Sequence, residues 1–254
     1  MRHSDKPSFR ERLHAQKPML GTFLKSPGVQ SVEILGDVGF DFAVIDAEHA
    51  PWDRRDIDLA ILAGRSQTMP ILVRVEGTAD ILNALDCGAT GVMVPHVSDP
   101  QIARDVVAAC RYQGGARGFS NSPRAGQYGA LSLGDHLKKS DDSVVVIAML
   151  EDGKALDHAA EIAEVEGIDA FFLGRGDLTV AMGETSTQAE TVQRAIGIFV
   201  EAVKAAGKPL CAFVGKTSEI PALQKLGVSM FILSSEQGLL RQAASAELSQ
   251  FQSL

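Results

Sequence analysis

Cysteine is scarce in this sequence, and its placement argues against whole classes of protein. The chain of 254 residues contains three cysteines, Cys87, Cys110 and Cys211, and none of them belongs to a C-x-x-C pair. An odd, scattered set argues against a disulfide framework and against a zinc knuckle. Such a set is typical of a protein kept in a reducing compartment.

Long apolar runs are also missing. The N-terminal segment MRHSDKPSFRERLHAQKP is polar and lacks the apolar stretch of a signal peptide. No apolar run approaches the roughly 20 residues that a helix needs to cross a bilayer. We therefore expect a soluble, cytoplasmic protein that has no membrane partner.

Basic residues are too few to balance the acidic ones. The sequence holds 24 Lys and Arg residues against 32 Asp and Glu residues, which gives a formal net charge of -8. A chain this acidic has no general attraction for phosphate backbones, so nucleic acid is not an expected partner. A small anionic substrate remains compatible with this charge, because an arginine or a bound metal can reverse the field inside a cleft.

Motifs for nucleotide binding and for imine chemistry are absent as well. The glycines of residues 114–118 form neither G-x-G-x-x-G nor a Walker loop. No lysine lies inside an apolar run, and Lys25 and Lys216 fall only near the ends of such runs. An enzyme that forms a Schiff base needs a lysine whose amine is desolvated, so the sequence argues against that mechanism.

What the sequence does contain is a repeated alternation of short apolar runs and amphipathic segments. The runs are rich in Val, Ile, Leu and Phe and mostly do not alternate with polar residues, which is typical of strands buried on both faces of a parallel sheet. They span residues 19–24, 42–46, 71–75, 91–95, 144–150, 168–174, 209–214 and 228–233. Segments with helical spacing lie between them, at residues 29–38, 54–65, 78–87, 99–111, 188–206 and 218–226.

This alternation predicts an α/β protein of the (β/α)8 TIM barrel type, formed as a single domain by residues 1–254. The runner-up is an open, doubly wound sheet, which needs no closure. We favour the barrel because about eight strand–helix units follow one another in one unbroken series, and no linker or shift in composition marks a second domain.

Segments near the two ends of the chain stand outside the barrel pattern. Residues up to about 17 form a polar N-terminal extension. Residues 236–251 carry an apolar stripe at helical spacing, which needs burial against this barrel or against a neighbouring one. The stripe consists of Leu239, Leu240, Ala243, Ala244 and Leu248.

The longest irregular stretch, residues 112–128, is rich in Gly, Arg and Ser and comes after the fourth predicted strand. Loops that follow strands form the active-site face of a TIM barrel, so one interpretation of this stretch is a substrate lid. The other interpretation is a solvated connector.

Two acidic residues stand where neighbouring predicted strands end, which is where the active sites of barrels form. Glu151 follows the fifth strand, and Asp177 follows the sixth. Two carboxylates that share one spot repel each other unless a cation lies between them. With waters and substrate as further ligands, the pair suits Mg²⁺ or Mn²⁺. The alternative is that each carboxylate caps a turn or pairs with a surface lysine.

A histidine follows the second predicted strand. His49 is flanked by Asp46 and Glu48, and a carboxylate can orient an imidazole and raise its basicity for work as a general base. The alternative is a structural histidine. His96 follows the fourth strand, but the sequence offers it no evident partner.

Two further features are candidates for holding the carboxylate of a small substrate. Arg74 lies on an otherwise apolar strand and can pair with an anion. A short helix is predicted over residues 177–182, and the backbone N–H groups at its start, on Gly176 and Asp177, can bind an anion as well.

In order and spacing, these elements resemble the HpcH/HpaI aldolase family, whose members are metal-dependent pyruvate aldolases. The resemblance extends from about residue 20 to about residue 244. It rests on Ile45-Asp46-Ala47-Glu48-His49-Ala50-Pro51, Val73-Arg74, Leu150-Glu151 and Phe172-Leu173-Gly174-Arg175-Gly176-Asp177-Leu178. The chain departs from the family at Arg175, where relatives usually have proline.

The resemblance implies a metal centre and a substrate site. It implies that Glu151 and Asp177 are ligands of a divalent metal, namely Mg²⁺, Mn²⁺ or Co²⁺. It implies that Arg74 holds the oxo and carboxylate oxygens of the substrate. It also implies that the backbone of Gly176, beside Asp177, contacts the substrate carboxylate.

The resemblance implies catalytic groups and an assembly as well. His49 matches the active-site base of the family, with Asp46 nearby, and Asp86 matches an acid associated with that histidine. The family fold is the phosphoenolpyruvate/pyruvate-binding barrel, which commonly forms a homohexamer whose last helix is exchanged between subunits.

The predicted activity is the reversible aldol cleavage and formation of 4-hydroxy-2-oxo acids from pyruvate or hydroxypyruvate and an aldehyde. One alternative is a malyl-CoA or citramalyl-CoA lyase on the same barrel, although no basic cluster is evident that would receive the phosphates of CoA. The other alternative is a non-catalytic protein that binds oxo acids.

Overall fold

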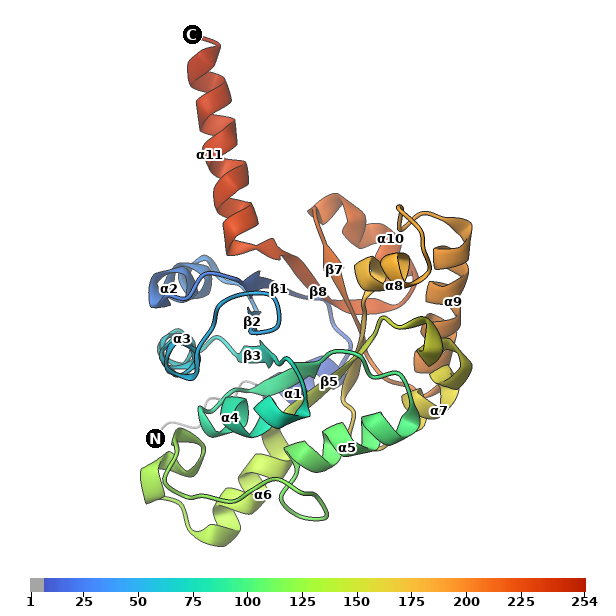
Figure 1. Cartoon of the computed structure of the whole chain (residues 1–254). Helices are drawn as coiled ribbons and strands as arrows, with labels where there is room; N and C mark the ends of the chain where they lie inside the picture. The colour runs from blue at the N-terminus through green and yellow to red at the C-terminus, as the bar shows by residue number, and fades with distance from the viewer. Residues whose placement is uncertain (1–6) are drawn as a thin grey trace.

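Eight parallel strands close into a barrel (Figure 1). In the computed structural model, which describes residues 7–254, the strands follow one another around the barrel in chain order. They are β1 (Met19–Leu24), β2 (Phe42–Asp46), β3 (Ile71–Arg74), β4 (Gly91–Val94), β5 (Val145–Leu150), β6 (Ala170–Leu173), β7 (Leu210–Val214) and β8 (Val228–Ser235). The (β/α)8 fold is confirmed, and the open sheet is wrong because β8 pairs with β1.

Helices connect successive strands on the outside of the barrel (Figure 1). They are α2 (Val29–Val38), α3 (Arg54–Ser66), α4 (Ile81–Asp86), α5 (Pro100–Cys110), α6 (Leu133–Ser143), α7 (Ala159–Glu164), α8 (Arg175–Ala181), α9 (Glu190–Ala205) and α10 (Ile220–Lys225). Short 3-10 helices are η1 (Thr78–Asp80), η2 (Arg124–Gly129), η3 (Gly153–His158) and η4 (Thr217–Glu219). The sequence pattern missed α6, because the side chains that this helix buries are the polar His136 and Ser140.

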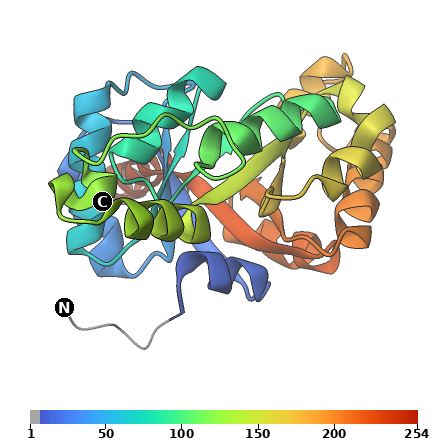
Figure 2. The same ribbon diagram turned by 90° about the horizontal axis from the view of Figure 1, so that it is seen from below.

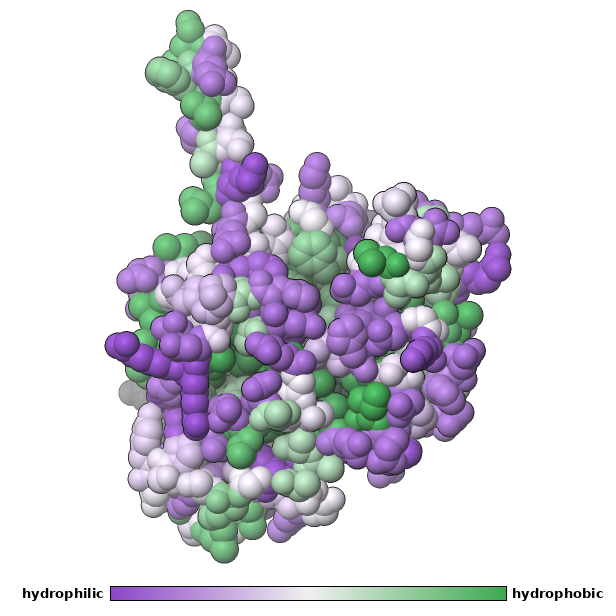
Figure 3. Space-filling model, viewed as in Figure 1, coloured by the Kyte–Doolittle hydropathy of each residue, from purple (hydrophilic) through white to green (hydrophobic). Residues whose placement is uncertain are grey.

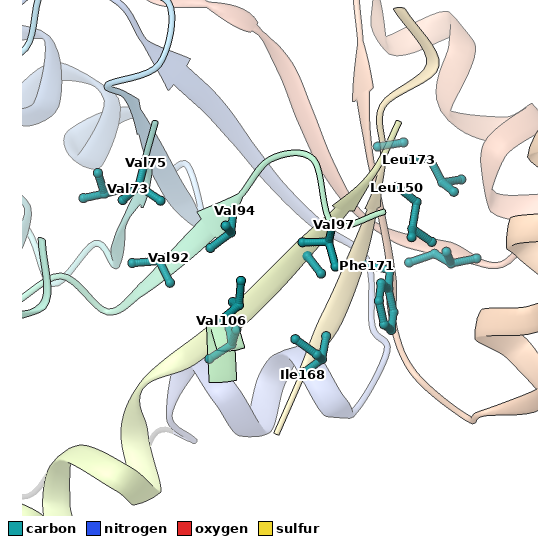
Figure 4. Packing of buried hydrophobic residues seen from close by; sticks show 14 of the residues in the cluster. Val73, Val75, Val92, Val94, Val97, Val106, Leu150, Ile168, Phe171 and Leu173 are labelled. Carbon is teal, nitrogen blue, oxygen red and sulfur yellow. The ribbon is translucent and has the colours of Figure 1, made fainter. Parts of the chain in front are cut away.

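The side chains of each strand alternate between two apolar layers. In β2, Phe42 and Val44 fill the interior of the barrel, whereas Ala43 and Ile45 belong to the layer beneath the helices. Figure 4 shows part of this outer layer, where residues from neighbouring strands pack together. Both layers are apolar, which explains why the strand sequences do not alternate between polar and apolar residues.

The predicted polar N-terminal extension contains a short helix that packs on the barrel. This helix, α1 (Phe9–His14), buries Phe9 and Leu13 in the same cluster that fills the barrel interior. The ring centroid of Phe9 lies 5.7 Å from that of Phe42, the first residue of β2. The helix therefore closes the end of the barrel at which the strands begin. Residues 1–6 of the extension lie outside the described residues.

The C-terminal helix projects away from the barrel (Figures 1 and 3). This helix, α11 (Glu236–Gln252), buries none of its residues in this chain. The apolar side chains of Leu240, Leu248 and Phe251 are 71%, 56% and 72% exposed. Leu239, at the base of the helix, packs in part against the core of the chain's own barrel, but this barrel does not cover the rest of the predicted apolar stripe.

The irregular stretch at residues 112–128 follows helix α5, so it is not one of the loops that lead from a strand to a helix. A connection from a helix to the next strand lies at the opposite end of the barrel from the strand C-termini. Figure 2 shows the green stretch beside α6. Within the stretch, Arg117 is buried and donates hydrogen bonds to Asp86 at 3.2 Å and Ser140 at 2.8 Å. The stretch is therefore a connector that packs between α4 and α6, and it is not a substrate lid.

Cys87, Cys110 and Cys211 all carry free thiols and are buried. Among the helices that the structure describes, none combines the length and the apolar character needed to cross a membrane.

Candidate active site

The alternation of the strands brings most of the candidate residues onto one rim of the barrel. The register between β2 and β3 pairs Asp46 with Arg74, the last residue of each strand. Leu150 and Leu173 belong to the layer beneath the helices, so Glu151 and Gly174, which follow them, turn toward the barrel axis. The alternation of side chains along each strand, and not closeness in sequence, therefore brings these residues together.

A cavity of about 560 Å³ lies at this rim. Among the predicted site residues, it is lined by His49, Arg74, Gly176 and Asp177. The other residues that line it are Phe23, Lys25, Phe172, Leu173, Gly174, Arg175, Thr187, Phe213, Gly215 and Glu219. The cavity thus combines apolar walls with several charged groups, as is common for sites that bind small polar molecules.

Asp46 is fully buried at the end of β2 and holds two cations. Its Oδ1 accepts hydrogen bonds from Nε and Nη2 of Arg74 at 2.9 and 2.8 Å, and the ammonium of Lys25 lies 2.5 Å from its Oδ2. Burial by itself raises the pKa of this carboxyl group, but the bonds from Arg74 and Lys25 outweigh burial, and the pKa of Asp46 is lowered. Asp46 therefore remains ionised and anchors both cations.

Arg74 is fixed from three directions. Besides its bonds to Asp46, its Nη1 lies 3.2 Å from Oε2 of Glu48, and its Cζ lies 4.8 Å from the ring centroid of Phe23. Its side chain is 8% exposed. A guanidinium held this firmly presents a positive charge to the cavity at little cost in side-chain entropy.

The imidazole ring of His49 is accessible and lies beside Glu48, whereas the backbone of His49 is bound to Asp46. Its side chain is 53% exposed, and Nε2 lies 3.5 Å from Oε2 of Glu48. Asp46 instead accepts a hydrogen bond from the backbone N–H of His49 at 3.2 Å. The sequence placed both acids next to the histidine, and the structure separates their roles.

Within one chain, the structure does not bring Asp86 and His49 together. Asp86 is the last residue of α4, its Oδ1 accepts a hydrogen bond from Arg117 at 3.2 Å, and it lines a separate cavity with Arg124 and Tyr128. The association between these two residues that the family resemblance implies therefore has no support from contacts inside this chain.

Glu151 is a buried carboxylate that lacks a full set of partners. Its Oε1 accepts a hydrogen bond from the backbone N–H of His96 at 2.9 Å, but within residues 7–254 its buried Oε2 has no hydrogen-bond donor. Burial and the nearby charges of Asp177 and Glu48 raise the pKa of Glu151 to about 7, although the bond from His96 opposes them.

The Glu151 carboxylate needs a glycine beside it. A Cβ atom added to Gly174 would lie 2.4 Å from Cβ of Glu151 and 2.6 Å from its Oε2. Helix α8 begins directly after this glycine, and Asp177 lies in its first turn. The first hydrogen bond of the helix joins the N–H of Leu178 to the carbonyl of Gly174, so the N–H groups of Gly176 and Asp177 precede the helical ladder.

These observations fit a divalent cation between Glu151 and Asp177. A buried carboxylate oxygen that has no hydrogen-bond donor and lies near a second carboxylate is an arrangement that a divalent cation would stabilise. In residues 7–254, no group of three or more His, Cys, Asp and Glu side chains is arranged to hold a metal. A cation at this position would therefore take its remaining ligands from water and substrate, as Mg²⁺ commonly does.

His96 has partners that the sequence pattern does not reveal. Its Nδ1 lies 3.2 Å from Oδ1 of Asp152, and its Nε2 lies 4.0 Å from Oε1 of Glu48. Partial burial lowers the pKa of His96, but the carboxylates of Asp152, Glu151 and Glu48 outweigh it, and the pKa is raised. Because Asp152 and Glu48 are remote from His96 in the sequence, only the folded rim brings these groups together.

Lys25 also lines the cavity, which its position near the end of an apolar run does not by itself predict. Its ammonium is paired with the buried carboxylate of Asp46. Imine formation needs an amine that can reach the carbonyl carbon of the substrate, whereas this ion pair holds the end of Lys25 against Asp46. The position of Lys25 is therefore better suited to holding charge in place than to forming an imine.

Comparison with known proteins points to one family. Residues 19–243 match the family described as HpcH/HpaI aldolase/citrate lyase. The chain is 34% identical over 238 residues to 2-dehydro-3,6-dideoxy-6-sulfogluconate aldolase of Pseudomonas putida, with 92% of both chains covered. It is 32% identical over 253 residues to hydroxypyruvate/pyruvate aldolase of Delftia acidovorans, with 96% of this chain and 91% of the relative covered.

Solved structures show the same likeness. The crystal structure of citrate synthase SbnG matches with a TM-score of 0.87 and 30% identity, covering 97% of this chain and 98% of the other. A family protein of Burkholderia cenocepacia matches with a TM-score of 0.91 and 28% identity, covering 96% and 98%. The similarity therefore includes the barrel together with its rim.

Proposed function

This chain belongs to the HpcH/HpaI aldolase/citrate lyase family, and from that premise we propose that it is a metal-dependent aldolase. Lyase activity follows from the family. The 2-oxo acid donor, the aldehyde acceptor and the metal are the parts that we propose. The observation that carries the proposal is the orphaned oxygen of Glu151, which lies near Asp177 on the same rim as the fixed guanidinium of Arg74.

We assign the divalent metal, Mg²⁺, Mn²⁺ or Co²⁺, to the carboxylates of Glu151 and Asp177. The chemistry that such an ion supplies is Lewis-acid stabilisation of the negative charge that develops on the oxo oxygen of the substrate. Gly174 leaves room for the Glu151 carboxylate, and burial of that carboxylate keeps it from being fully hydrated.

The oxo acid is held by groups that are already fixed before it binds. Arg74 cannot reorient without losing its bonds to Asp46 and Glu48, so it offers its charge in one direction. We propose that it holds the oxo and carboxylate oxygens of pyruvate or hydroxypyruvate. The backbone of Gly176, at the start of α8, is proposed as a second contact to the carboxylate.

Proton transfer is assigned to His49, whose imidazole lines the cavity. In the direction of addition, the C3 carbon of the oxo acid loses a proton to the base and forms a bond to the aldehyde carbon. The aldehyde oxygen takes up a proton and becomes the 4-hydroxyl group of a 4-hydroxy-2-oxo acid. Cleavage runs through the same steps in reverse.

The proposed function predicts products that a screen can detect. We expect the enzyme, supplied with Mg²⁺, Mn²⁺ or Co²⁺, to form 4-hydroxy-2-oxo acids from pyruvate or hydroxypyruvate and at least one aldehyde of a broad set. It should also exchange the methyl protons of pyruvate in D₂O, as NMR can follow. A lack of both product and exchange would contradict the proposal. So would trapping of a pyruvate adduct at Lys25 by borohydride, because that outcome shows imine chemistry.

We propose in addition that the chain forms a homo-oligomer, specifically a hexamer. The apolar side chains of α11 are exposed in the single chain, and apolar patches of this kind mark surfaces that bind other protein. We therefore expect light scattering at micromolar concentration to give about six times the chain mass of 27.0 kDa. A monomeric mass would refute this prediction.

A matched pair of variants tests the role of α11 in assembly. The double variant Leu240→Glu and Leu248→Glu places charges on the apolar stripe, and we expect it to have a lower mass in solution. Ser245→Glu adds a charge to an exposed polar position of the same helix and should keep the mass of the unaltered protein. Equal masses for all of these proteins would show that α11 does not hold the subunits together.

A further inference from the structure

Arg175 places a third cation in the cavity, and the proposed reaction does not yet use it. It is the first residue of α8, its side chain is 15% exposed, and it lines the cavity together with Arg74 and Lys25. Its Nη2 donates hydrogen bonds to the backbone carbonyl of Phe213 at 2.6 Å and to Oε2 of Glu219 at 3.2 Å. One nitrogen of the guanidinium therefore fixes the group, and within residues 7–254 Nη1 and Nε donate no hydrogen bond.

Arg175 and Arg74 lie on opposite sides of the barrel mouth. Arg74 ends β3, whereas the Arg175 guanidinium is bonded to Phe213, which belongs to β7. In a closed barrel whose strands run in the order β1 to β8, β3 and β7 are diametrically opposed. A substrate that reaches across the cavity from Arg74 therefore comes to Arg175.

The three cations differ in how fully their charge is compensated. Lys25 and Arg74 face the fully buried Asp46, and Arg74 also faces Glu48. The counter-charge of Arg175 is Glu219, whose side chain is 41% exposed to water. Glu219 also accepts hydrogen bonds from the backbone N–H groups of Gly215 at 2.9 Å and Lys216 at 3.2 Å, so its charge is shared. Arg175 is thus better able to attract an anion than Lys25 or Arg74.

We propose that Arg175 binds the terminal anionic group of the aldehyde, so that the preferred acceptors are aldehydes that carry a carboxylate. This inference rests on the proposed function, because the oxo acid occupies the side of the cavity formed by Arg74, Glu151 and Asp177. The aldehyde then enters on the side of β7 and β1, where the rings of Phe23 and Phe213 stack with their centroids 6.3 Å apart. These rings can pack against the carbon chain of the acceptor, and the guanidinium of Arg175 can donate hydrogen bonds to its carboxylate.

The test compares two aldehydes with the same number of carbons, succinic semialdehyde with a carboxylate and butanal without one. Pyruvate is the donor, and kcat/KM is measured for each aldehyde. We expect the unaltered enzyme to favour succinic semialdehyde, and Arg175→Gln to lower kcat/KM for that aldehyde by about 10- to 100-fold, the usual range for hydrogen bonds to a charged group. For butanal the expected change is no more than a few-fold.

Two further variants make the comparison specific. Lys216→Gln removes one positive charge at the same end of β7, but Lys216 is exposed and does not line the cavity, so the ratio of the two kcat/KM values should stay within about two-fold. Arg175→Lys keeps a positive charge but loses the planar guanidinium that can donate two parallel hydrogen bonds. Its ratio of the two kcat/KM values should therefore lie between that of the unaltered enzyme and that of Arg175→Gln. The lysine variant also serves if the glutamine variant does not fold.

Several results would overturn the inference. Equal losses for both aldehydes, or a loss in Arg175→Lys as large as in Arg175→Gln, would make Arg175 a structural residue of the β6 and β7 loops. A rise in the KM of pyruvate that accounts for the whole effect would assign Arg175 to the donor. If the unaltered enzyme neither adds pyruvate to any aldehyde nor exchanges its methyl protons, the proposed function itself fails and the inference falls with it.

Discussion

Replacement of Glu151 by glutamine should lower the rate of aldol addition by about 10³-fold or more, because a bound metal contributes several kcal/mol to the stabilisation of a developing charge. The amide keeps the shape of the side chain but removes one of the two negative charges that we assign to the metal. Asp177→Asn should behave in the same way. A chelator should abolish the activity of the unaltered enzyme, and added Mn²⁺, Mg²⁺ or Co²⁺ should restore it.

The loss of activity in Glu151→Gln should not come with a loss of stability. Burial and the charges of Asp177 and Glu48 disfavour the ionised form of Glu151 in the metal-free protein, as its pKa of about 7 indicates. The neutral amide avoids that cost, so the metal-free variant should melt at the same temperature as the unaltered protein or higher. A matched control is Glu161→Gln, because the Glu161 side chain is 68% exposed on α7 and does not line the cavity. Full turnover in excess chelator would contradict the metal assignment.

The barrel could be predicted from the sequence because its strands are buried on both faces. Runs such as those of β2 and β3 contain apolar residues at consecutive positions, and the first polar residues after them mark the rim. Asp46, Arg74 and Glu151 are each the first polar residue at a strand end, and the structure places all three at the rim. Here the local pattern and the tertiary fold give the same information.

Contacts across the rim could not be predicted, because they depend on strand register and loop path. His96 meets Glu48 and Asp152 after the fourth strand, and its backbone has a φ of 56°, a conformation that a sequence pattern does not reveal for histidine. Helix α6 escaped prediction for a related reason, since its buried face is polar. The end of the barrel at which residues 112–128 lie depends on helix α5, which separates them from the fourth strand.

Replacement of His49 by alanine should separate binding from proton transfer. We expect the variant to slow metal-dependent exchange of the pyruvate methyl protons into D₂O by at least about 10²-fold, the lower end of what general acid–base groups contribute. Its affinity for pyruvate should stay within a few-fold, because Arg74, Glu151 and Asp177 are the groups assigned to hold the oxo acid. Exchange is the suitable assay because it needs no aldehyde, so the preference for an acceptor cannot affect it.

Because His49 is exposed, a change in the exchange rate can be separated from a change in stability. Its side chain is 53% exposed, so its removal leaves no buried cavity and should change the stability of the fold little. His158→Ala is a matched control, since the His158 side chain is 46% exposed and pairs with Glu161 on the outer helix α7; this variant should exchange protons at the unaltered rate. Arg74→Ala should differ from both, because it should weaken the binding of the oxo acid as well as the rate.

The exchange rates of the His49 variants also decide between the base and its alternatives. If His49 is a structural histidine that Asp46 holds through the backbone N–H, His49→Asn should exchange protons nearly as fast as the unaltered enzyme. If a water or buffer anion at the metal takes the proton, the loss in His49→Ala should be small, and added buffer should restore the rate. Either result would remove His49 from proton transfer and leave the assignments of Glu151 and Asp177 intact, because those depend on chelation and not on the imidazole.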